Sequence, residues 1–303
     1  MLVVLGVFLA SNGAKQTNWT FTNVLAQIGL GYPFVFLILG WRPGWQFAAA
    51  LAILVGYWAF FAFWPLPGLG GSWPVVSAYG RLPLHWLKGF NAASAFDAKL
   101  LNLLPRPDGK PFLGNVGGYT TLNFVPSIAT AIFGVLAGRL LKADRPARGK
   151  LQILAVAGAI GVVLGVLLDG TVCPVIKRIW TPSWAIASGG WACLLMAGFY
   201  LVVDVWGWRK LAFPLVVVGA NSIAIYLMAQ LSKPWISQTL RTHLSTLRHV
   251  VEARLGLGGL PEISTGRGIF AGPYGPLLDT SAVLACFWLA CLWLYRRKIF
   301  IRI

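Results

Sequence analysis

The stretch LQILAVAGAIGVVLGVLLD (151–169) decides the fold, because it carries no charged side chain before Asp169 closes it. A helix rises about 1.5 Å per residue, so about 20 apolar residues cross a hydrocarbon core of roughly 30 Å. Similar stretches recur at 23–41, 45–64, 124–141, 184–203, 211–231 and 277–295. All are apolar on every side, which favours helices over the alternating strands of a membrane barrel. We therefore predict an all-α, polytopic transmembrane helix bundle of about seven complete helices.

The first ten residues, MLVVLGVFLA, are also apolar but cover only about half a bilayer. They lack the basic leading segment that a signal peptide would carry. We interpret them as the last part of a further helix that runs from inside to outside, so the sequence predicts an N-terminal partial helix.

The distribution of charge supports a membrane protein. Soluble domains carry roughly 25% charged residues, whereas this chain of 303 residues is 11% charged and 57% hydrophobic. Its net charge of +17 does not predict a nucleic-acid partner, because the most densely placed basic residues lie in short connections between apolar stretches. These residues are Arg42; Lys142, Arg145, Arg148 and Lys150; Arg209 and Lys210; and Arg296, Arg297, Lys298 and Arg302. If the helices alternate, all these connections share one side, and the positive-inside rule assigns that side and the C-terminus to the cytoplasm.

On the opposite side the alternation places two long segments, 65–123 and 232–276, as extracytoplasmic loops of a single transmembrane domain that spans 1–303. The first loop holds aromatic side chains that either stack on sugar rings or sit at the membrane interface, namely Trp73, Tyr79, Trp86 and Tyr119. In the second loop, apolar residues at helical spacing between Ile236 and Val251 predict an amphipathic helix on the outer leaflet.

Small residues predict close helix packing. Gly134 and Gly138 form one GxxxG pair, and Gly161 and Gly165 form another. Such pairs let helix backbones approach closely and would also permit a homodimer within the membrane lipid. The four cysteines do not have the spacing of a disulfide framework, and we interpret them as packing residues.

The polar residues near the spans leave two interpretations open. Every carboxylate lies in a predicted loop or near a helix end, which argues against a proton-driven pump, because such transporters commonly hold ionisable groups inside the membrane. The amides of Gln27, Asn123 and Asn221 do lie within spans or at their outer entrance. They either form hydrogen bonds between helices or line a polar cavity that crosses the bundle.

Four stretches, in this order along the chain, resemble the heparan-α-glucosaminide N-acetyltransferase family and its bacterial relatives of unassigned substrate. These stretches are NVLAQIGLGY (23–32), GGYTTLNFVPSIATAIFGVLAG (117–138), PVIKRIWTPSW (174–184) and FPLVVVGANSIAIY (213–226). The segment NAASAFDAKLL (91–101) resembles the outer loop of that family, and LYRRKIFIRI (294–303) resembles its closing segment.

The resemblance implies a membrane acyltransferase that takes an acetyl group from cytoplasmic acetyl-CoA and delivers it to an amino sugar or glycan on the other side, in a bacterial inner membrane. A general base, usually histidine, must help to remove the amine proton, and His85 is the remaining candidate for it. The expected substrate-binding residues are Asn123, Lys177, Trp180 and Asn221. The expected acetyl-CoA-binding residues are Gln27, Arg297 and Lys298. No metal is expected.

The chain departs from the family at its front. The family's Asp-x-x-Arg-Gly signature and its catalytic histidine lie in helices that would precede residues 1–10, and this sequence has neither. The alternative hypothesis is therefore a catalytically inactive, truncated homologue that binds a membrane partner or handles a glycan or lipid.

Overall fold

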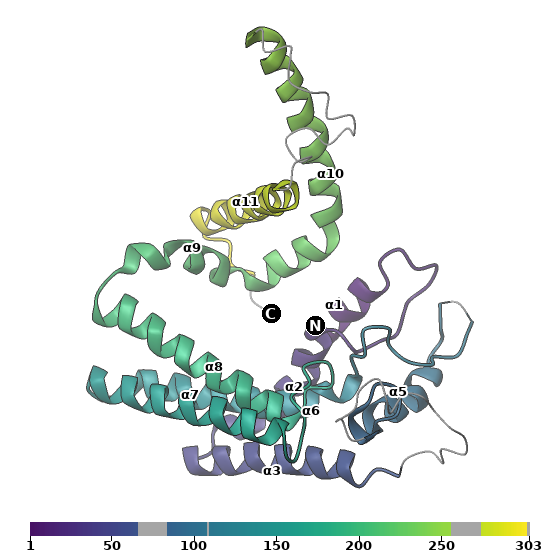
Figure 1. Cartoon of the computed structure of the whole chain (residues 1–303), viewed down its shortest axis with the longest axis vertical. Helices are drawn as coiled ribbons and strands as arrows, with labels where there is room; N and C mark the ends of the chain where they lie inside the picture. The colour runs from purple at the N-terminus through teal and green to yellow at the C-terminus, as the bar shows by residue number, and fades with distance from the viewer. Residues whose placement is uncertain (66–83, 108, 256–273, 302–303) are drawn as a thin grey trace. The chain divides into compact units, whose positions relative to one another are not determined.

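The computed structural model describes residues 1–65, 84–107, 109–255 and 274–301, with only the backbone described for Leu84 and residues 244–255. The described residues form helices and no strand (Figure 1), which confirms the predicted all-α fold. The helices are α1 (Leu2–Ala10), α2 (Val24–Leu39), α3 (Pro43–Ala62), η1 (Leu84–Trp86), α5 (Ala92–Asn102), η2 (Thr121–Asn123), α6 (Phe124–Lys142), α7 (Ala147–Asp169), α8 (Pro182–Phe199), η3 (Tyr200–Val205), α9 (Arg209–Ala220), α10 (Ser222–Leu255) and α11 (Gly275–Arg296).

Each of the seven predicted stretches is helical, but they do not all have the form of a complete span. Within the described ranges, five helices are long and apolar enough to cross a membrane: α3, α6 with η2, α7, α8 with η3, and α11. The stretch 211–231 is instead a bent pair of helices, because α9 and α10 meet at Asn221 with a bend of 68°. The remaining helix, α2, has 16 residues and contains Pro33.

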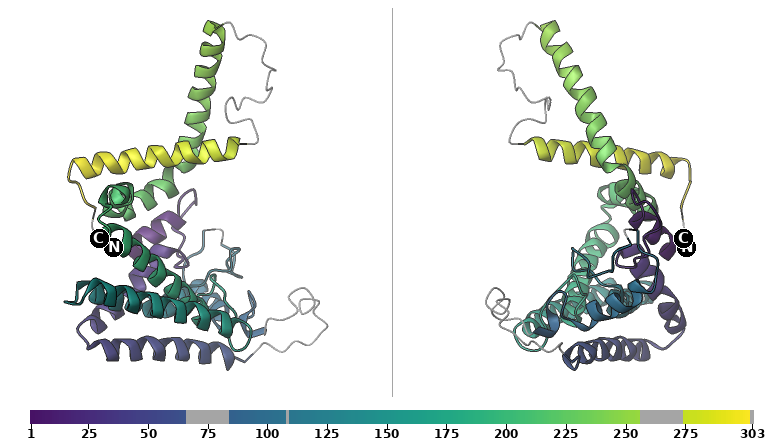
Figure 2. Two further views of the ribbon diagram at one scale, coloured as in Figure 1. Left: turned by 60° about the vertical axis from the view of Figure 1, so that its left-hand side comes forward. Right: turned by 90° about the vertical axis from the view of Figure 1, so that its right-hand side faces the viewer.

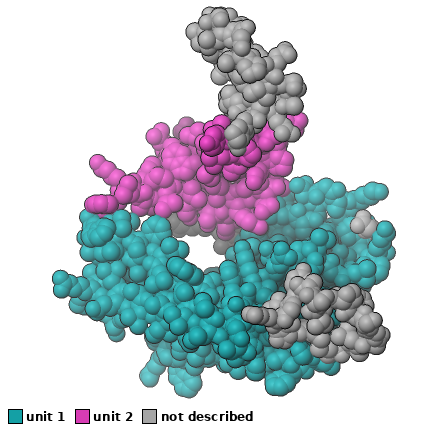
Figure 3. Space-filling model, viewed as in Figure 1, with its two compact units in different colours: residues 1–207 teal, residues 208–303 magenta. Residues whose placement is uncertain are grey.

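The chain divides into two compact units, Met1–Gly207 and Trp208–Ile303, which are coloured separately in Figure 3. In unit 1, α6 packs against α2, α3 and α8, and α7 lies along α8 in both views of Figure 2. Its core is formed by small and branched side chains of α3, α6 and α8, including Ala50, Leu54, Ile132 and Ala185. In unit 2, α11 packs against both α9 and α10.

Unit 1 has a basic end, where α2, α6 and the start of α7 come together. The guanidinium of Arg139 donates to the carbonyl oxygens of Trp41 (2.8 Å) and Leu39 (2.6 Å), and the ammonium of Lys150 donates to the Leu141 carbonyl (2.7 Å). The segments that were predicted to lie outside meet at the other end, where the amide of Asn115 donates to the Thr22 hydroxyl. Within unit 1 the helices therefore alternate as the basic connections predicted.

The two predicted glycine pairs differ in whether a neighbouring helix packs against them. An added Cβ at Gly161 would lie 2.9 Å from the Gly190 Cα, and one at Gly190 would lie 2.6 Å from the Val162 nitrogen, so α7 and α8 touch backbone to backbone. The prediction of close packing is confirmed for this pair. It is wrong for Gly134 and Gly138 among the described residues, because an added Cβ at either position meets nothing within 4 Å. Helix α6 packs through its other faces.

This difference supplies a matched pair of variants. We expect Gly190→Ala to destabilise unit 1 by about 1–3 kcal/mol, because the added methyl forces α7 and α8 apart in a filled contact. We expect Gly134→Ala to be neutral or slightly stabilising, because alanine is the better helix former and the methyl enters open space. Thermal unfolding of the purified chain in detergent measures both. A loss of equal size in the two variants would contradict the assigned α7–α8 contact.

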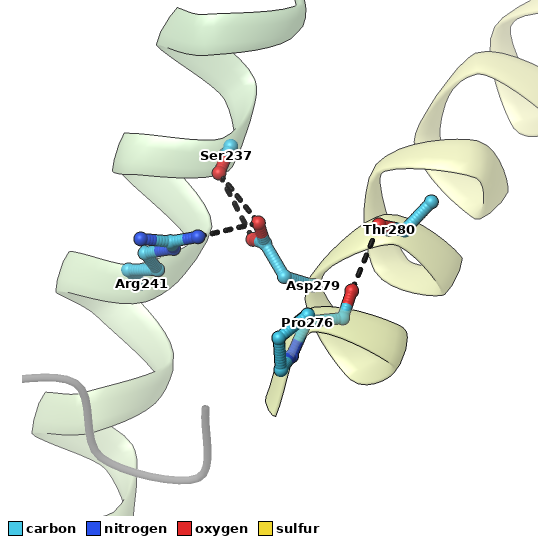
Figure 4. Close-up of polar contacts among 5 residues, drawn as sticks. All are labelled: Ser237, Arg241, Pro276, Asp279 and Thr280. Carbon is cyan, nitrogen blue, oxygen red and sulfur yellow. Dashed lines mark hydrogen bonds and ion pairs between the residues drawn. The ribbon is translucent and has the colours of Figure 1, made fainter. Parts of the chain in front are cut away.

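In unit 2, α10 and α11 are joined by an ion pair near one end of α11. The carboxylate of Asp279 accepts a hydrogen bond from the Arg241 guanidinium at 2.7 Å and from the Ser237 hydroxyl at 2.9 Å (Figure 4). The neighbouring Thr280 hydroxyl donates back to the Pro276 carbonyl of its own helix. A single carboxylate thus fixes two positions of α10 against α11.

The predicted amphipathic helix of the second loop is confirmed as a helix but has different bounds. Helix α10 runs from Ser222 to Leu255, so the predicted surface helix continues directly from the preceding span. Residues 256–273 of the predicted loop lie outside the described residues. In the first loop, Trp73 and Tyr79 also lie outside the described residues.

Candidate functional site

A buried polar cluster lies at the end of unit 1 opposite the basic connections. It is built on α5, whose first turn is capped by Asn91, because this side chain accepts from the Ser94 nitrogen (2.8 Å) and donates to the Leu87 carbonyl (2.9 Å). Just before α5, the Trp86 ring stacks on Phe61 of α3, with ring centroids 5.0 Å apart. Cap and ring together fix α5 against the end of α3.

Helix α5 brings one carboxylate, Asp97, into the interior. Its side chain is 1% exposed and accepts both of its hydrogen bonds from the backbone nitrogen of Thr121, at 2.9 and 3.2 Å. No lysine or arginine of the described part of the chain forms an ion pair with it. Burial therefore raises the pKa of Asp97, and the hydrogen bonds from Thr121 offset part of that rise.

The raised pKa has a consequence for stability. Between the ordinary pKa of a carboxyl and the raised value of Asp97, the folded protein keeps a proton that the unfolded chain has released, so stability falls as the pH rises through this window. Asp97→Asn removes this titration and retains an oxygen for Thr121. We expect the variant to gain stability relative to the wild type as the pH rises, which unfolding in detergent over a pH series measures. A difference independent of pH would contradict the expectation.

Asn123 joins three separate segments beside Asp97. Its side-chain oxygen accepts from the Thr120 hydroxyl at 2.7 Å, and its side-chain nitrogen donates to the Arg178 carbonyl at 2.8 Å. The side-chain amide of Gln27, from α2, donates to the backbone carbonyl of Asn123 at 3.3 Å. All three of the Thr120, Asn123 and Gln27 side chains are buried, so few alternative partners compete for these bonds.

A pocket of about 290 Å³ opens beside this cluster, and Asp97 lines it. Its wall also includes Lys88, Ser94, Tyr119 and Thr120, together with the strip of residues from Phe112 to Val116. The volume is close to the lower end of the range for small-molecule sites, roughly 300–1,000 Å³. A monosaccharide is therefore of a suitable size for it.

Cationic side chains lie near this pocket. An added Cβ at Gly118 would lie 3.4 Å from Lys88 and 3.5 Å from Arg178, so these two side chains flank the same glycine. A second pocket of about 280 Å³ shares the strip from Phe112 to Val116 and is lined by Arg106 and Lys110. Among the described residues, no group of three or more histidine, cysteine or carboxylate side chains lies close enough to hold a metal ion.

The structure brings several of the predicted site residues together. Gln27 and Asn123 are in direct contact. Lys177 and Trp180 lie on either side of Arg178 in the sequence, and the carbonyl of Arg178 accepts the hydrogen bond from Asn123. The Trp180 indole donates to the Thr130 hydroxyl at 3.3 Å, and its backbone has a φ of 48°. Gln27 was predicted as an acetyl-CoA ligand with the basic tail, but the structure places it in the same network as the predicted substrate ligand Asn123.

The other predicted residues lie elsewhere. His85 is half-buried in η1, and it is not among the residues that line either pocket. Asn221, Arg297 and Lys298 belong to unit 2, where Asn221 is fully buried and the two basic side chains are exposed. Both amide atoms of Asn221 bind the tail backbone, at Ile299 and Ile301. Of the two interpretations of Asn221, the structure favours hydrogen bonding, with the tail rather than another helix as partner.

No protein-family model matches this chain, and no curated protein matches it either. The fold and the site geometry, together with the resemblance of the sequence, are therefore the basis for a functional proposal.

Proposed function

We propose that the chain is a membrane-bound acyltransferase that moves an acetyl group from cytoplasmic acetyl-CoA to an amino sugar on the extracytoplasmic side. We place it in a bacterial cytoplasmic membrane, with its C-terminus inside. The pocket beside Asp97 would hold the acceptor sugar, and the basic end of unit 1 would face the donor.

The observation that carries this proposal is the meeting of three stretches that resemble the acetyltransferase family. Gln27 comes from the first stretch, Asn123 from the second and Arg178 from the third, and hydrogen bonds join them directly. These stretches lie far apart in the sequence, yet residues from all three meet at one end of one helix bundle. The second stretch also supplies Gly118, Tyr119 and Thr120 to the wall of the pocket.

The charges of unit 1 support the proposed direction of transfer. Coenzyme A is polyanionic, and basic side chains attract and bind its phosphates. Arg42, Arg139, Lys142 and Lys150 lie at the basic end, away from the pocket. Donor and acceptor would thus approach from different faces, and the thioester end of the donor would have to reach the acceptor amine within the bundle.

The test is an assay of acetyl transfer with the full chain in detergent. Radiolabelled acetyl-CoA and glucosamine are supplied, and the N-acetylated sugar is separated and counted. We expect product that depends on both substrates, and binding of acetyl-CoA that coenzyme A displaces more effectively than ATP. The absence of both binding and product would overturn the proposal in favour of a non-catalytic protein that handles glycan or lipid.

A further inference from the structure

We propose that Asp97 holds the amine of the acceptor as an ammonium ion and takes its proton when transfer begins. This inference rests on the proposed function and assigns the proton transfer to a residue that sequence reasoning had not placed in the site. It also defines the acceptor as a primary amine on a group small enough for the pocket.

The placement of the carboxylate supports this role. Asp97 lines the pocket, is 1% exposed, and receives hydrogen bonds from Thr121, at 2.9 and 3.2 Å from its backbone nitrogen. A carboxylate has about four acceptor positions, so this one retains capacity for a ligand. An unpaired buried charge is costly, and a bound ammonium would remove that cost.

Other titratable and charged groups surround Asp97. Lys88 and Tyr119 share the pocket wall, and the Lys88 ammonium is already directed to the Val116 carbonyl. Tyr57 and Cys173 belong to the packed cluster behind α5, and the Tyr57 hydroxyl donates to the Ile179 carbonyl at 3.1 Å. Arg178 flanks Gly118 and is exposed. Asp97 is the only carboxylate among these groups, so it is the group that can attract a cationic amine.

His85 is the rival for the same role. It is half-buried beside Trp86, and the residues that line the pocket do not include it. A general base must come within hydrogen-bond reach of the proton that it removes, directly or through one water. In the present geometry, Asp97 satisfies this condition for a ligand in the pocket better than His85 does.

In the proposed step, one proton of the ammonium passes to Asp97 and a second passes to the departing thiolate. The ammonium gives one proton to the Asp97 carboxylate, which leaves a neutral amine with a free electron pair. The nitrogen then bonds to the carbonyl carbon of the acyl thioester, the carbon–sulfur bond breaks, and the departing thiolate takes the second nitrogen proton. Asp97 afterwards releases its proton to water, so the products are the amide, the free thiol and one proton.

The experiment compares the wild-type chain with Asp97→Asn, Asp97→Glu and His85→Gln, all purified in detergent. Asp97→Asn keeps an acceptor for the Thr121 nitrogen, and its unfolding curve shows whether the fold survives. Saturation-transfer NMR measures the preference for glucosamine over N-acetylglucosamine, which has no ammonium. The rate of acetyl transfer is followed over a pH series. Binding is therefore read separately from transfer.

We expect Asp97→Asn to lose the preference for glucosamine and to slow transfer by about 10²–10⁴-fold, the usual contribution of a general base. The acidic limb of the pH profile should disappear with it, and Asp97→Glu should restore part of the rate. His85→Gln should keep both the preference and the acidic limb.

Each other outcome is decisive. Transfer by Asp97→Asn at the wild-type rate, with an unchanged acidic limb, would overturn the inference and leave the proposed function standing. Glucosamine binding that depends on Asp97, without transfer by the wild type, would support the amine site and overturn both the proton transfer and the acyltransferase. The absence of both binding and transfer would overturn the two proposals together.

Discussion

Asn123→Leu is expected to lower the free energy of unfolding by about 2–5 kcal/mol, because it leaves two partners of a buried amide without their hydrogen bonds, at about 1–3 kcal/mol each. The substitution removes the acceptor of the Thr120 hydroxyl and the donor to the Arg178 carbonyl. Leucine is similar in size, so steric strain contributes little. Because the same amide ties Arg178 to the pocket wall, we also expect weaker binding of glucosamine.

Gln27→Met is the matched control for this substitution. Gln27 also carries a buried amide in this network, but its side chain makes a single described hydrogen bond, to the backbone carbonyl of Asn123. Its loss should cost about 0.5–1.5 kcal/mol, the net value of one neutral hydrogen bond. Unfolding by heat in detergent measures both variants. Equal losses would show that Asn123 does not join the three segments.

The sequence was a good guide to the helices, because membrane spans are specified by length and composition. The run at 151–169 became α7 within a few residues of its predicted bounds. The break at Asn221 was not predictable in this way, because both flanking segments are apolar and the partner of Asn221 is the distant tail.

The glycine pairs show a second limit of the sequence. A GxxxG pattern permits close approach but does not identify the face on which a neighbour lies. Gly161 faces Gly190 of α8, whereas Gly134 and Gly138 face no described atom within 4 Å. The local spacing is the same in the two helices, so only the packing of the bundle could distinguish them.

The candidate site was partly visible in the sequence. Gln27, Asn123 and the segment around Trp180 were singled out as polar residues at helix entrances, and they do meet. Asp97 was noted only as a loop carboxylate. The available signal was its position in AASAFDAKLL, where Ala93, Asp97 and Leu101 are spaced four residues apart and share the buried face of α5. Burial of that face became evident only from its packing.

Asn221→Leu is expected to release the C-terminal tail and to lower the free energy of unfolding by about 2–4 kcal/mol, since it orphans one donor and one acceptor. The Asn221 amide donates to the Ile299 carbonyl at 3.1 Å and accepts from the Ile301 nitrogen at 2.9 Å. Asn221 also follows the end of α9 at the 68° bend, so the residue that binds the tail lies at the bend itself. Faster protease cleavage within the tail and a lower unfolding temperature should appear together.

Ile301→Pro tests this contact from the other side, because proline removes the backbone donor and the Ile301 side chain is already 43% exposed. If the two residues act through the same hydrogen bond, the double variant should be less destabilised than the sum of the single variants, by about 0.5 kcal/mol or more. Additive losses would mean that Asn221 stabilises the bend independently of the tail. Because this cycle is measured by unfolding alone, it remains informative whether or not Asn221 also contacts a substrate.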